Sequence, residues 1–287
     1  MPQVSVVIPT RDRADYLEVA LRSLGAQDGG ASVDARDAGV AHEVIVVDDG
    51  STDATPEVAR RHGARVVRPG RRGGLNAARN AGARAAAAAL VAYVDDDVAV
   101  PPGWIAALVD GAARHPQVEA FGGPIRARLE GSAPRSCGRE RPPITTLDLG
   151  AHDREADLVW GANMMVRSAA LERIGEFPEE IAGGGDEEEW LRRLRARGGT
   201  VMYLAGAGLD HRRSGEDARL RSLMRAAFGR GRALRAYDRR RGSGPPLRRE
   251  LRVLAGCGWH TVRRACPQGL IMGAHSAGRV LETVRRR

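Results

Sequence analysis

Hydrophobic residues in the first hundred positions follow two alternating patterns. Short β-branched runs, which are typical of buried strands, occur at residues 4–8, 43–47, 65–67 and 91–94. Between them, apolar residues three and four positions apart predict helices over residues 15–24, 52–62 and 77–89. Strands that alternate with helices of these lengths predict βαβ units and a mostly parallel sheet flanked by helices, which is an α/β fold.

The pattern is less regular after residue 100. It predicts helices at residues 104–115, 169–174 and 190–197 and strands at residues 118–123 and 200–204, with 200–204 as the last strand. Residues 158–166 have the pattern of part loop and part strand. Two stretches lack a hydrophobic period: we expect a loop at residues 25–42 and a long loop or two short strands at residues 124–157.

The C-terminal quarter has helical spacing with arginines on one side. Residues 220–234 predict an amphipathic helix whose polar face carries Arg221, Arg225, Arg232 and Arg235. Ser214 and Asp217, just before it, resemble a capping box. After a linker at residues 242–246, we expect residues 247–287 to be helical, with breaks near residues 256–258 and Pro267.

Charge is distributed unevenly along the chain. The 287 residues carry a net charge of +9, and every residue counted as Lys or Arg is arginine. Residues 211–287 contain 20 Arg and 5 acidic residues, whereas the remainder contains 25 Arg and 31 acidic residues. The basic C-terminal region indicates an anionic partner, either a membrane surface or a phosphate-bearing substrate.

Cysteine usage and hydropathy favour a cytoplasmic protein. Cys137, Cys257 and Cys266 match no zinc-binding pattern and no disulfide framework, which suits a reducing compartment. No run of about 18 apolar residues predicts a transmembrane helix. The N-terminus runs directly into a strand without the features of a signal peptide. We therefore expect a cytoplasmic location, with a peripheral position on the inner face of the membrane as the alternative.

Three consecutive carboxylates, Asp95, Asp96 and Asp97, follow the predicted strand at residues 91–94. Because strand side chains alternate, Asp95 and Asp97 are expected on one side, where they could chelate Mg²⁺ or Mn²⁺. The alternative is a solvated acidic turn. Ligands of parallel sheets bind beyond the carboxyl ends of the strands, and Pro9-Thr10 and Asp48-Asp49 follow two further strands. We expect the three strand ends to converge on one site.

A second acidic group, Asp186 to Glu189, follows three glycines at the start of a predicted helix. Acidic residues in a first turn interact favourably with the helix dipole, so a structural role is the default, above all for Glu188 and Glu189. Four acids exceed what capping requires. Clustered carboxylates raise one another's pKa, which helps one of them to act as a base.

Five motifs occur in the order and spacing of the family 2 glycosyltransferases, and the chain resembles these enzymes over roughly residues 3–230. The motifs are V-S-V-V-I-P-T, V-I-V-V-D-D-G-S-T-D, A-A-R-N-A-G, V-D-D-D and G-A-N-M-M-V. The resemblance implies a GT-A fold with a single Rossmann-like, mixed and mostly parallel sheet. It places a catalytic domain at residues 1–212, with a nucleotide-sugar half at about 1–100 and an acceptor half at about 101–212, before a helical, arginine-rich extension at residues 213–287.

The resemblance also implies an activity and a donor site. Such an enzyme moves a hexosyl or related sugar from a UDP-, GDP- or dTDP-linked donor to a hydroxyl acceptor, inverting the anomeric centre by in-line displacement. By resemblance, the base and ribose would lie against Pro9, Thr10, Asp48 and Asp49. Arg11 stands where many relatives carry an aromatic residue, and its guanidinium could stack on the base. Arg79 stands where relatives place a basic residue facing the nucleotide, and a solvated arginine on a helix face is the equal alternative.

The acidic triplet matches the family's DXD motif. Asp97 is expected to be the main metal ligand, with Asp95 or Asp96 meeting the ribose or the metal. His211 follows the last predicted strand, where some relatives place a third ligand, and a structural histidine is the alternative. The bound cation would neutralise the leaving nucleoside diphosphate.

Two further segments match the acceptor side of the family. Asp186-Glu187 corresponds to its Glu-Asp pair with the order exchanged, so one of them is the expected general base, and the position favours Glu187. Trp160, Gly161 and Asn163 match the acceptor loop. Trp160 could stack on a flat acceptor face or belong to the core.

Other classes of protein are less compatible with the sequence. A nicotinamide-dependent dehydrogenase needs glycines after its first strand, where this chain has residues 9–13 without any. A nucleic-acid-binding protein would need aromatic residues among its arginines, but aromatics are 4% of the chain, and we expect no nucleic-acid partner. A peripheral-membrane glycosyltransferase with a lipid-linked acceptor remains open, because the arginine-rich helices could lie on an anionic leaflet. A helical cap with a solvated basic face is the alternative.

Overall fold

The computed structural model describes residues 1–25, 40–131, 133–135, 137–138, 143–181 and 186–285. The chain forms two compact units, each described by itself. The first comprises Met1–Ala127, Thr145–Glu180 and Asp186–His211, and the second consists mainly of Arg128–Ile144 and Arg212–Arg287. Most of the loop predicted at residues 25–42, and the glycines before Asp186, lie outside the described residues.

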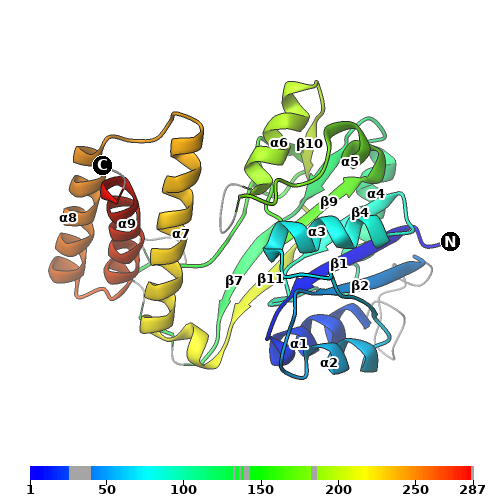
Figure 1. Cartoon of the computed structure of the whole chain (residues 1–287), viewed down its shortest axis with the longest axis horizontal. Helices are drawn as coiled ribbons and strands as arrows, with labels where there is room; N and C mark the ends of the chain where they lie inside the picture. The colour runs from blue at the N-terminus through cyan, green and yellow to red at the C-terminus, as the bar shows by residue number, and fades with distance from the viewer. Residues whose placement is uncertain (26–39, 132, 136, 139–142, 182–185, 286–287) are drawn as a thin grey trace. The chain divides into compact units, whose positions relative to one another are not determined.

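The first unit is built on an eight-stranded sheet with the strand order β3-β2-β1-β4-β9-β6-β10-β8 (Figure 1). Its strands are β1 (Val4–Thr10), β2 (His42–Asp48), β3 (Arg65–Val67), β4 (Leu90–Val94), β6 (Ala120–Gly122), β8 (Arg154–Glu155), β9 (Asn163–Arg167) and β10 (Val201–Tyr203). The β3-β2-β1-β4 part is parallel, and β9 runs antiparallel between β4 and β6. The predicted mixed, mostly parallel sheet is confirmed.

A smaller sheet has the strand order β5-β11-β7. It is made of β5 (Val98–Ala99), β7 (Ile125–Leu129) and β11 (Leu209–Arg213). The prediction that residues 200–204 form the last strand is therefore wrong. The sequence of β11, Leu-Asp-His-Arg-Arg, is too polar to give a strand signal. Between residues 124 and 157, β7 and β8 confirm the alternative of two short strands.

Helices cover both faces of the large sheet. They are α1 (Ala14–Gly25), α2 (Thr55–Arg61), α3 (Gly74–Ala85), α4 (Trp104–Arg114), α5 (Ser168–Ile174) and α6 (Asp186–Ala196). One core cluster joins apolar residues of α1, α2 and α4 to the sheet, and the other joins those of α3, α5 and α6. Strand β1 serves both, since Val6 and Ile8 belong to the first cluster and Val7 to the second.

Helix α3 ends four residues before the predicted position at residue 89. Ala86 already has extended backbone. The next two amides have partners outside the helix: Ala87 N–H donates to the Glu43 carboxylate at 2.7 Å and Ala88 N–H to the Ser5 hydroxyl at 3.1 Å. These tertiary hydrogen bonds override the helix propensity of the alanine run.

The second unit contains the helices α7 (Leu220–Arg240), α8 (Leu247–Arg264) and α9 (Gln268–Val284). The capping box predicted at Ser214 is wrong, because its side chain makes no cap hydrogen bond to the 3₁₀ turn Gly215–Ala218. The break predicted at residues 256–258 is also wrong, since α8 runs through both glycines. The break predicted near Pro267 is confirmed by the interval between α8 and α9.

Helix α9 packs closely on α7 and is tied to both neighbours by buried charge. Gly278 allows this approach, because a β-carbon at its position would lie only 2.2 Å from the Phe228 carbonyl oxygen of α7. Arg279 donates to Glu250 of α8 at 2.6 Å and to Asp238 of α7 at 2.8 Å. Arg235, predicted on the polar face of the helix at residues 220–234, is buried at 9% exposed. Among the described residues, none of the helices has the length and hydropathy to span a membrane.

Candidate active site

The carboxyl ends of the parallel strands meet at the acidic triplet. Strands β1 and β4 are neighbours, so Thr10 and the residues after Val94 leave the sheet at the same edge. The Thr10 hydroxyl donates to Asp96 Oδ2 at 2.8 Å, and this hydrogen bond is buried. Asp96 and Asp97 are 6% and 3% exposed. The alternative of a solvated acidic turn is therefore wrong.

Asp95 and Asp97 share one side of the triplet, as predicted, although the three acids lie in a turn after β4. Asp96 turns to Thr10, whereas Asp95 and Asp97 turn to His211, and one ligand atom from each of these three lies within 4.8 Å of the others. His211 comes from β11, which pairs with β5 directly after the triplet through His211 and Val98. The smaller sheet thus brings the histidine to the acids.

The histidine geometry suits a metal ligand. His211 Nδ1 lies 3.2 Å from the Thr145 carbonyl oxygen, and Nε2 lies 3.0 Å from Asp97 Oδ1. We infer from the first contact that Nδ1 carries a proton, which it donates to the carbonyl. Nε2 then faces an acceptor, the Asp97 carboxylate, so a second proton or a cation has to lie between them. Two carboxylate oxygens and one such nitrogen fit a divalent cation, and the carbonyl would orient the ring from behind.

Arg13 belongs to this site, although we assigned it no role from the sequence. Its Nη1 lies 3.3 Å from Asp97 Oδ2, and its Nε lies 3.5 Å from Asp96 Oδ1. The guanidinium also lies over the Tyr16 ring. The sequence did show two arginines directly after β1, at positions 11 and 13, and we predicted that Arg11 would be the one to contact the nucleotide. Arg11 is exposed and pairs with Asp12.

Burial changes the protonation of Asp96. It raises the pKa of this carboxyl to about 7, with a further increase from Asp97, and Arg13 acts in the opposite direction. The carboxyl is thus close to its titration midpoint at neutral pH. A cation bound beside it would lower this pKa and release a proton.

Asp48 and Asp49 already have partners within the fold. Asp49 accepts the N–H groups of Gly73 and Gly74 at 2.9 and 3.0 Å, so it anchors the start of α3. Asp48 accepts Ser51 N–H at 2.8 Å and Arg68 Nε at 2.6 Å. Both acids therefore shape the end of β2. Their contacts with a nucleotide, like those of Pro9 and Thr10, stay predictions.

Arg79 connects the triplet to the second acidic group. It is 1% exposed, so the alternative of a solvated helix arginine is wrong. Its Nη1 donates to Asp186 Oδ2 at 2.6 Å, and its Nη2 donates to Glu187 Oε1 at 3.0 Å. The same Nη2 lies 3.8 Å from Asp95 Oδ1. One buried cation therefore lies among three carboxylates.

The neighbouring Asn80 holds the helix of Arg79 in place. Its side chain donates to the Phe177 carbonyl and accepts the Phe177 N–H, both at 2.9 Å. The Phe177 ring lies 5.9 Å from the Arg79 guanidinium carbon. We gave Asn80 no role from the sequence, although the A-A-R-N-A-G motif contains it.

The two acids of the second group have opposite pKa shifts. Burial and the neighbouring Glu187 raise the pKa of Asp186 to about 7, against the effect of Arg79. Burial also acts to raise the pKa of Glu187, but Arg79 and hydrogen bonds from Asp186 and Gly161 outweigh it, so the pKa is lowered. Glu187 is therefore ionised at neutral pH, whereas the pKa of Asp186 lies close to neutral pH.

Gly161 leaves room for this ion pair. Its N–H donates to Glu187 Oε1 at 3.0 Å. A β-carbon at this position would lie 2.2 Å from Arg79 Nη2 and 2.5 Å from Glu187 Oε1. Only glycine fits here without displacing the arginine or the carboxylate.

Asn163 and Trp160 are the other two residues of the predicted acceptor loop. Asn163 is fully buried, accepts the Trp104 indole N–H at 3.2 Å and donates to the Ala207 carbonyl at 2.8 Å. Its amide is thus committed to the fold, although we predicted it at the acceptor. Trp160 is partly buried against the core cluster that includes α1 and α4, and stacking on an acceptor stays a prediction.

The central sheet and its two layers of helices define a mixed α/β protein. The sequence model of Glycosyl transferase family 2 matches residues 5–175, and the chain belongs to this family. Mannosyltransferase PcManGT from Pyrobaculum calidifontis, solved in complex with GDP-Man and Mn²⁺, has a similar structure. The TM-score is 0.65 at 20% identity, covering 100% of this chain and 88% of that chain, which confirms the GT-A fold.

Two curated relatives extend the comparison. Validoxylamine A glucosyltransferase from Streptomyces hygroscopicus subsp. jinggangensis (strain 5008) is 30% identical over 229 residues, which cover 69% of this chain and 52% of that protein. Pre-mycofactocin glycosyltransferase from Mycobacterium tuberculosis (strain ATCC 25618 / H37Rv) is 31% identical over 222 residues, covering 73% and 43%. The chain thus spans about half the length of these relatives.

Proposed function

We propose that this chain is a glycosyltransferase that moves a sugar from a nucleotide-diphosphate donor to an acceptor hydroxyl with the help of a divalent cation. The observation that carries the proposal is the convergence of Asp95, Asp97 and His211 beside the carboxylate pair that Arg79 holds. The relatives named as glycosyltransferases support it, as does the GDP-Man and Mn²⁺ bound to PcManGT.

The donor side uses the acidic triplet. Asp95, Asp97 and His211 would hold Mg²⁺ or Mn²⁺, which when bound neutralises negative charge on the leaving diphosphate. Arg13 supplies a second positive group at the same carboxylates, 3.3 Å from Asp97. Its planar guanidinium is suited to a phosphate oxygen.

The acceptor side uses Glu187 as the general base. Arg79 Nη2 contacts both Glu187 and Asp95 of the triplet. Asp186 binds the other nitrogen, Nη1. Glu187 is therefore the acid on the side of the triplet. The acceptor oxygen forms a bond to the anomeric carbon while its proton passes to Glu187 and the bond from that carbon to the diphosphate oxygen breaks. A single displacement of this kind inverts the anomeric centre.

Nucleotide binding tests the donor site. We expect one of UDP, GDP, dTDP and CDP to raise the unfolding temperature, and to do so only with Mn²⁺. At a hundred times its dissociation constant, a ligand stabilises the fold by about 2.7 kcal/mol, which is a readable shift in a thermal melt. Absence of a shift with all four nucleotides at saturating concentration and Mn²⁺ would contradict the proposal.

Isosteric variants test the base. With the stabilising nucleotide sugar as donor and water as acceptor, Glu187→Gln should lower the rate of donor hydrolysis by about 10²–10⁴-fold, the usual contribution of a general base. Asp186→Asn is the matched control, because Asp186 is the adjacent carboxyl and also binds Arg79. This variant should lower the rate of donor hydrolysis less than Glu187→Gln does. If Asp186→Asn lowers the rate of donor hydrolysis more than Glu187→Gln does, Asp186 is the general base.

A second candidate, a peripheral-membrane glycosyltransferase with a lipid-linked acceptor, is favoured by the outer side of α8. Leu251, Trp259 and Val262 are 47%, 68% and 81% exposed, and their spacing places them on one side of the helix. Arginines at positions 248, 252 and 263 lie beside them in the helical projection. An exposed apolar stripe with adjacent arginines is typical of helices that lie in an anionic membrane surface.

Sedimentation with vesicles tests this candidate. The full chain should sediment with phosphatidylserine vesicles and remain in solution with phosphatidylcholine vesicles. The double variant Trp259→Ser, Val262→Ser should lose most of the sedimenting fraction. Leu75→Ser, which removes an apolar residue that is 41% exposed in the first unit, is the control and should sediment like the wild type. Equal sedimentation of both variants would exclude α8 as the membrane-binding side.

A further inference from the structure

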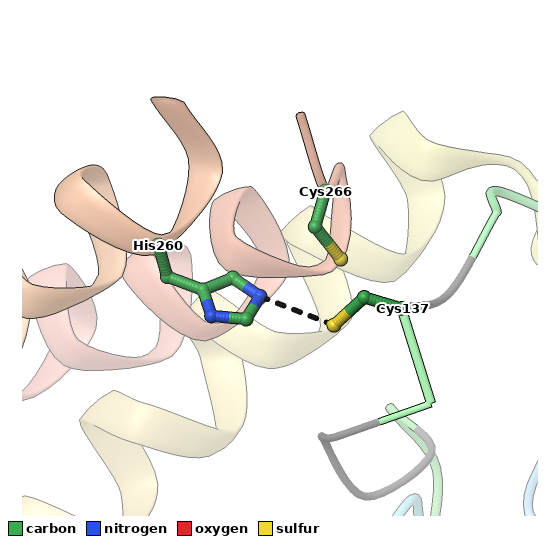
Figure 2. A group of neighbouring side chains, drawn as sticks. All are labelled: Cys137, His260 and Cys266. Atoms are coloured by element: carbon green, nitrogen blue, oxygen red, sulfur yellow. Dashed lines mark hydrogen bonds between the residues drawn. The ribbon is translucent and has the colours of Figure 1, made fainter. Parts of the chain in front are cut away.

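A second group of metal-ligating side chains lies within the second unit, made of Cys137, His260 and Cys266 (Figure 2). Cys137 follows β7 in the chain, His260 is near the end of α8, and Cys266 is in the turn between α8 and α9. Figure 2 shows the three side chains directed toward one another. One ligand atom from each lies within 4.8 Å of the others.

The distances are close to those of a zinc site. With Zn–S near 2.3 Å and Zn–N near 2.0–2.1 Å, tetrahedral angles put sulfur roughly 3.6 Å from nitrogen and roughly 3.8 Å from the second sulfur. Cys137 Sγ lies 3.5 Å from His260 Nε2. The other separations in the group are at most 4.8 Å, so each needs to close by no more than about 1 Å to reach these values.

The kind of ligand favours zinc. Two of the three side chains are cysteines, and Cys266 is only 3% exposed beside the other two ligands. Thiolate and neutral imidazole are the forms that bind a metal ion, and thiolate ligands select zinc over magnesium and manganese.

We propose that Cys137, His260 and Cys266 bind a zinc ion, with solvent in the fourth position. The ion would join the segment around Cys137 to the end of α8 and to the turn before α9. That turn contains Ala265, whose φ of 48° is unusual for a residue with a side chain, so an added link at Cys266 would hold it. The site is independent of the proposed glycosyltransferase activity.

The sequence prediction that the cysteines match no zinc pattern overlooked this group. A zinc pattern is recognised by short spacings within the chain, but 123 residues separate Cys137 from His260. Only the folded second unit brings the ligands together. The oxygen-rich set at Asp97 is chemically different, so the two sites can be distinguished by spectroscopy.

Cobalt substitution tests the proposal. The full chain, reduced with a phosphine, is titrated with Co²⁺ and its absorbance recorded. We expect a sulfur-to-cobalt charge-transfer band that saturates at one equivalent and is displaced by Zn²⁺. Cys137→Ala and Cys266→Ala should each lose the band or reduce it strongly. Asp97→Ala should keep it, because the acidic site contributes no sulfur.

Cys257→Ala is the matched control, since Cys257 is a buried thiol one turn before His260 on α8 and outside the group. This variant should keep the band. Cys137 is exposed, so its replacement tests the site without disturbing the core, and circular dichroism checks the fold of each variant.

Three results would overturn the proposal. The first is a wild-type protein without the charge-transfer band at several equivalents of Co²⁺. The second is a band that survives the double variant Cys137→Ala, Cys266→Ala. The third is a Cys137–Cys266 disulfide found by mass spectrometry in air-exposed protein whose reduced form takes up neither Co²⁺ nor Zn²⁺, which would make the pair a redox group instead.

Discussion

Replacing Asp97 with alanine is expected to abolish Mn²⁺-dependent nucleotide binding and to lower sugar transfer by roughly 10³-fold, since a bound cation supplies several kcal/mol of transition-state stabilisation. Asp97 is the carboxylate that His211 and Arg13 share in the proposed donor site. One of its oxygens lies 3.0 Å from His211 Nε2, and the other lies 3.3 Å from Arg13 Nη1. Without it, Asp95 and His211 alone are too few to hold the ion.

Thermal melts with the stabilising nucleotide, with and without Mn²⁺, measure this effect directly. Asp210→Asn is the control, because Asp210 precedes His211 on β11 but pairs with Arg126 at 2.7 Å outside the metal-ligating group. The control should keep the Mn²⁺-dependent shift. A shift of wild-type size in Asp97→Ala would remove this residue from the metal site.

Replacing Arg79 with methionine is expected to destabilise the fold by about 3–5 kcal/mol, the cost of leaving buried charges unpaired. Asp186 and Glu187 would lose their common partner within a site that has little contact with water. Arg79 now lowers the pKa of Glu187. Its removal would raise that pKa above the value in the unfolded chain.

The sign of the pH dependence follows from this change. In the variant, the folded state would bind more protons than the unfolded state between the two pKa values of Glu187, so stability falls as pH rises through that range. The destabilisation relative to wild type should therefore be smaller at about pH 5 than at about pH 8. Urea unfolding at both pH values measures it.

Arg84→Met provides the matched control for this comparison. Arg84 is on the same helix, α3, and pairs with Glu176, but its side chain is 57% exposed. An exposed ion pair contributes about 0–1 kcal/mol, so little change is expected at either pH. If Arg79→Met lost as little stability as Arg84→Met, water would have to reach Asp186 and Glu187 and screen their charges.

The local parts of the fold and site could be predicted from the sequence. The strands β1, β2, β3 and β4 lie within two residues of their predicted positions, because a buried strand in a parallel sheet is a short β-branched run bounded by polar residues. The grouping of Asp95 with Asp97 was also predicted, although the triplet lies in a turn after β4 and the strand alternation used to predict it does not extend that far.

The remainder depends on pairing between distant segments. His211 is placed by a polar strand that has no hydropathy signal, and the end of α3 is set by Glu43 and Ser5 from other elements. The burial of Arg79 arises from acids more than a hundred positions later in the chain. A pattern along one segment cannot report such contacts, because their energy exists only when both segments are in place.

The space around Gly161 has a consequence for studies of acceptor choice. A screen of substitutions in the loop at residues 160–163 would score Gly161→Ala as a loss of acceptor use. The cause would lie elsewhere, since the added methyl group would lie 2.2 Å from Arg79 Nη2 and 2.5 Å from Glu187 Oε1 and would push both side chains aside. Variation at position 161 would therefore report on the alignment of Glu187, the proposed base, and acceptor preference is better sought at Trp160, the proposed acceptor contact, which is only partly buried.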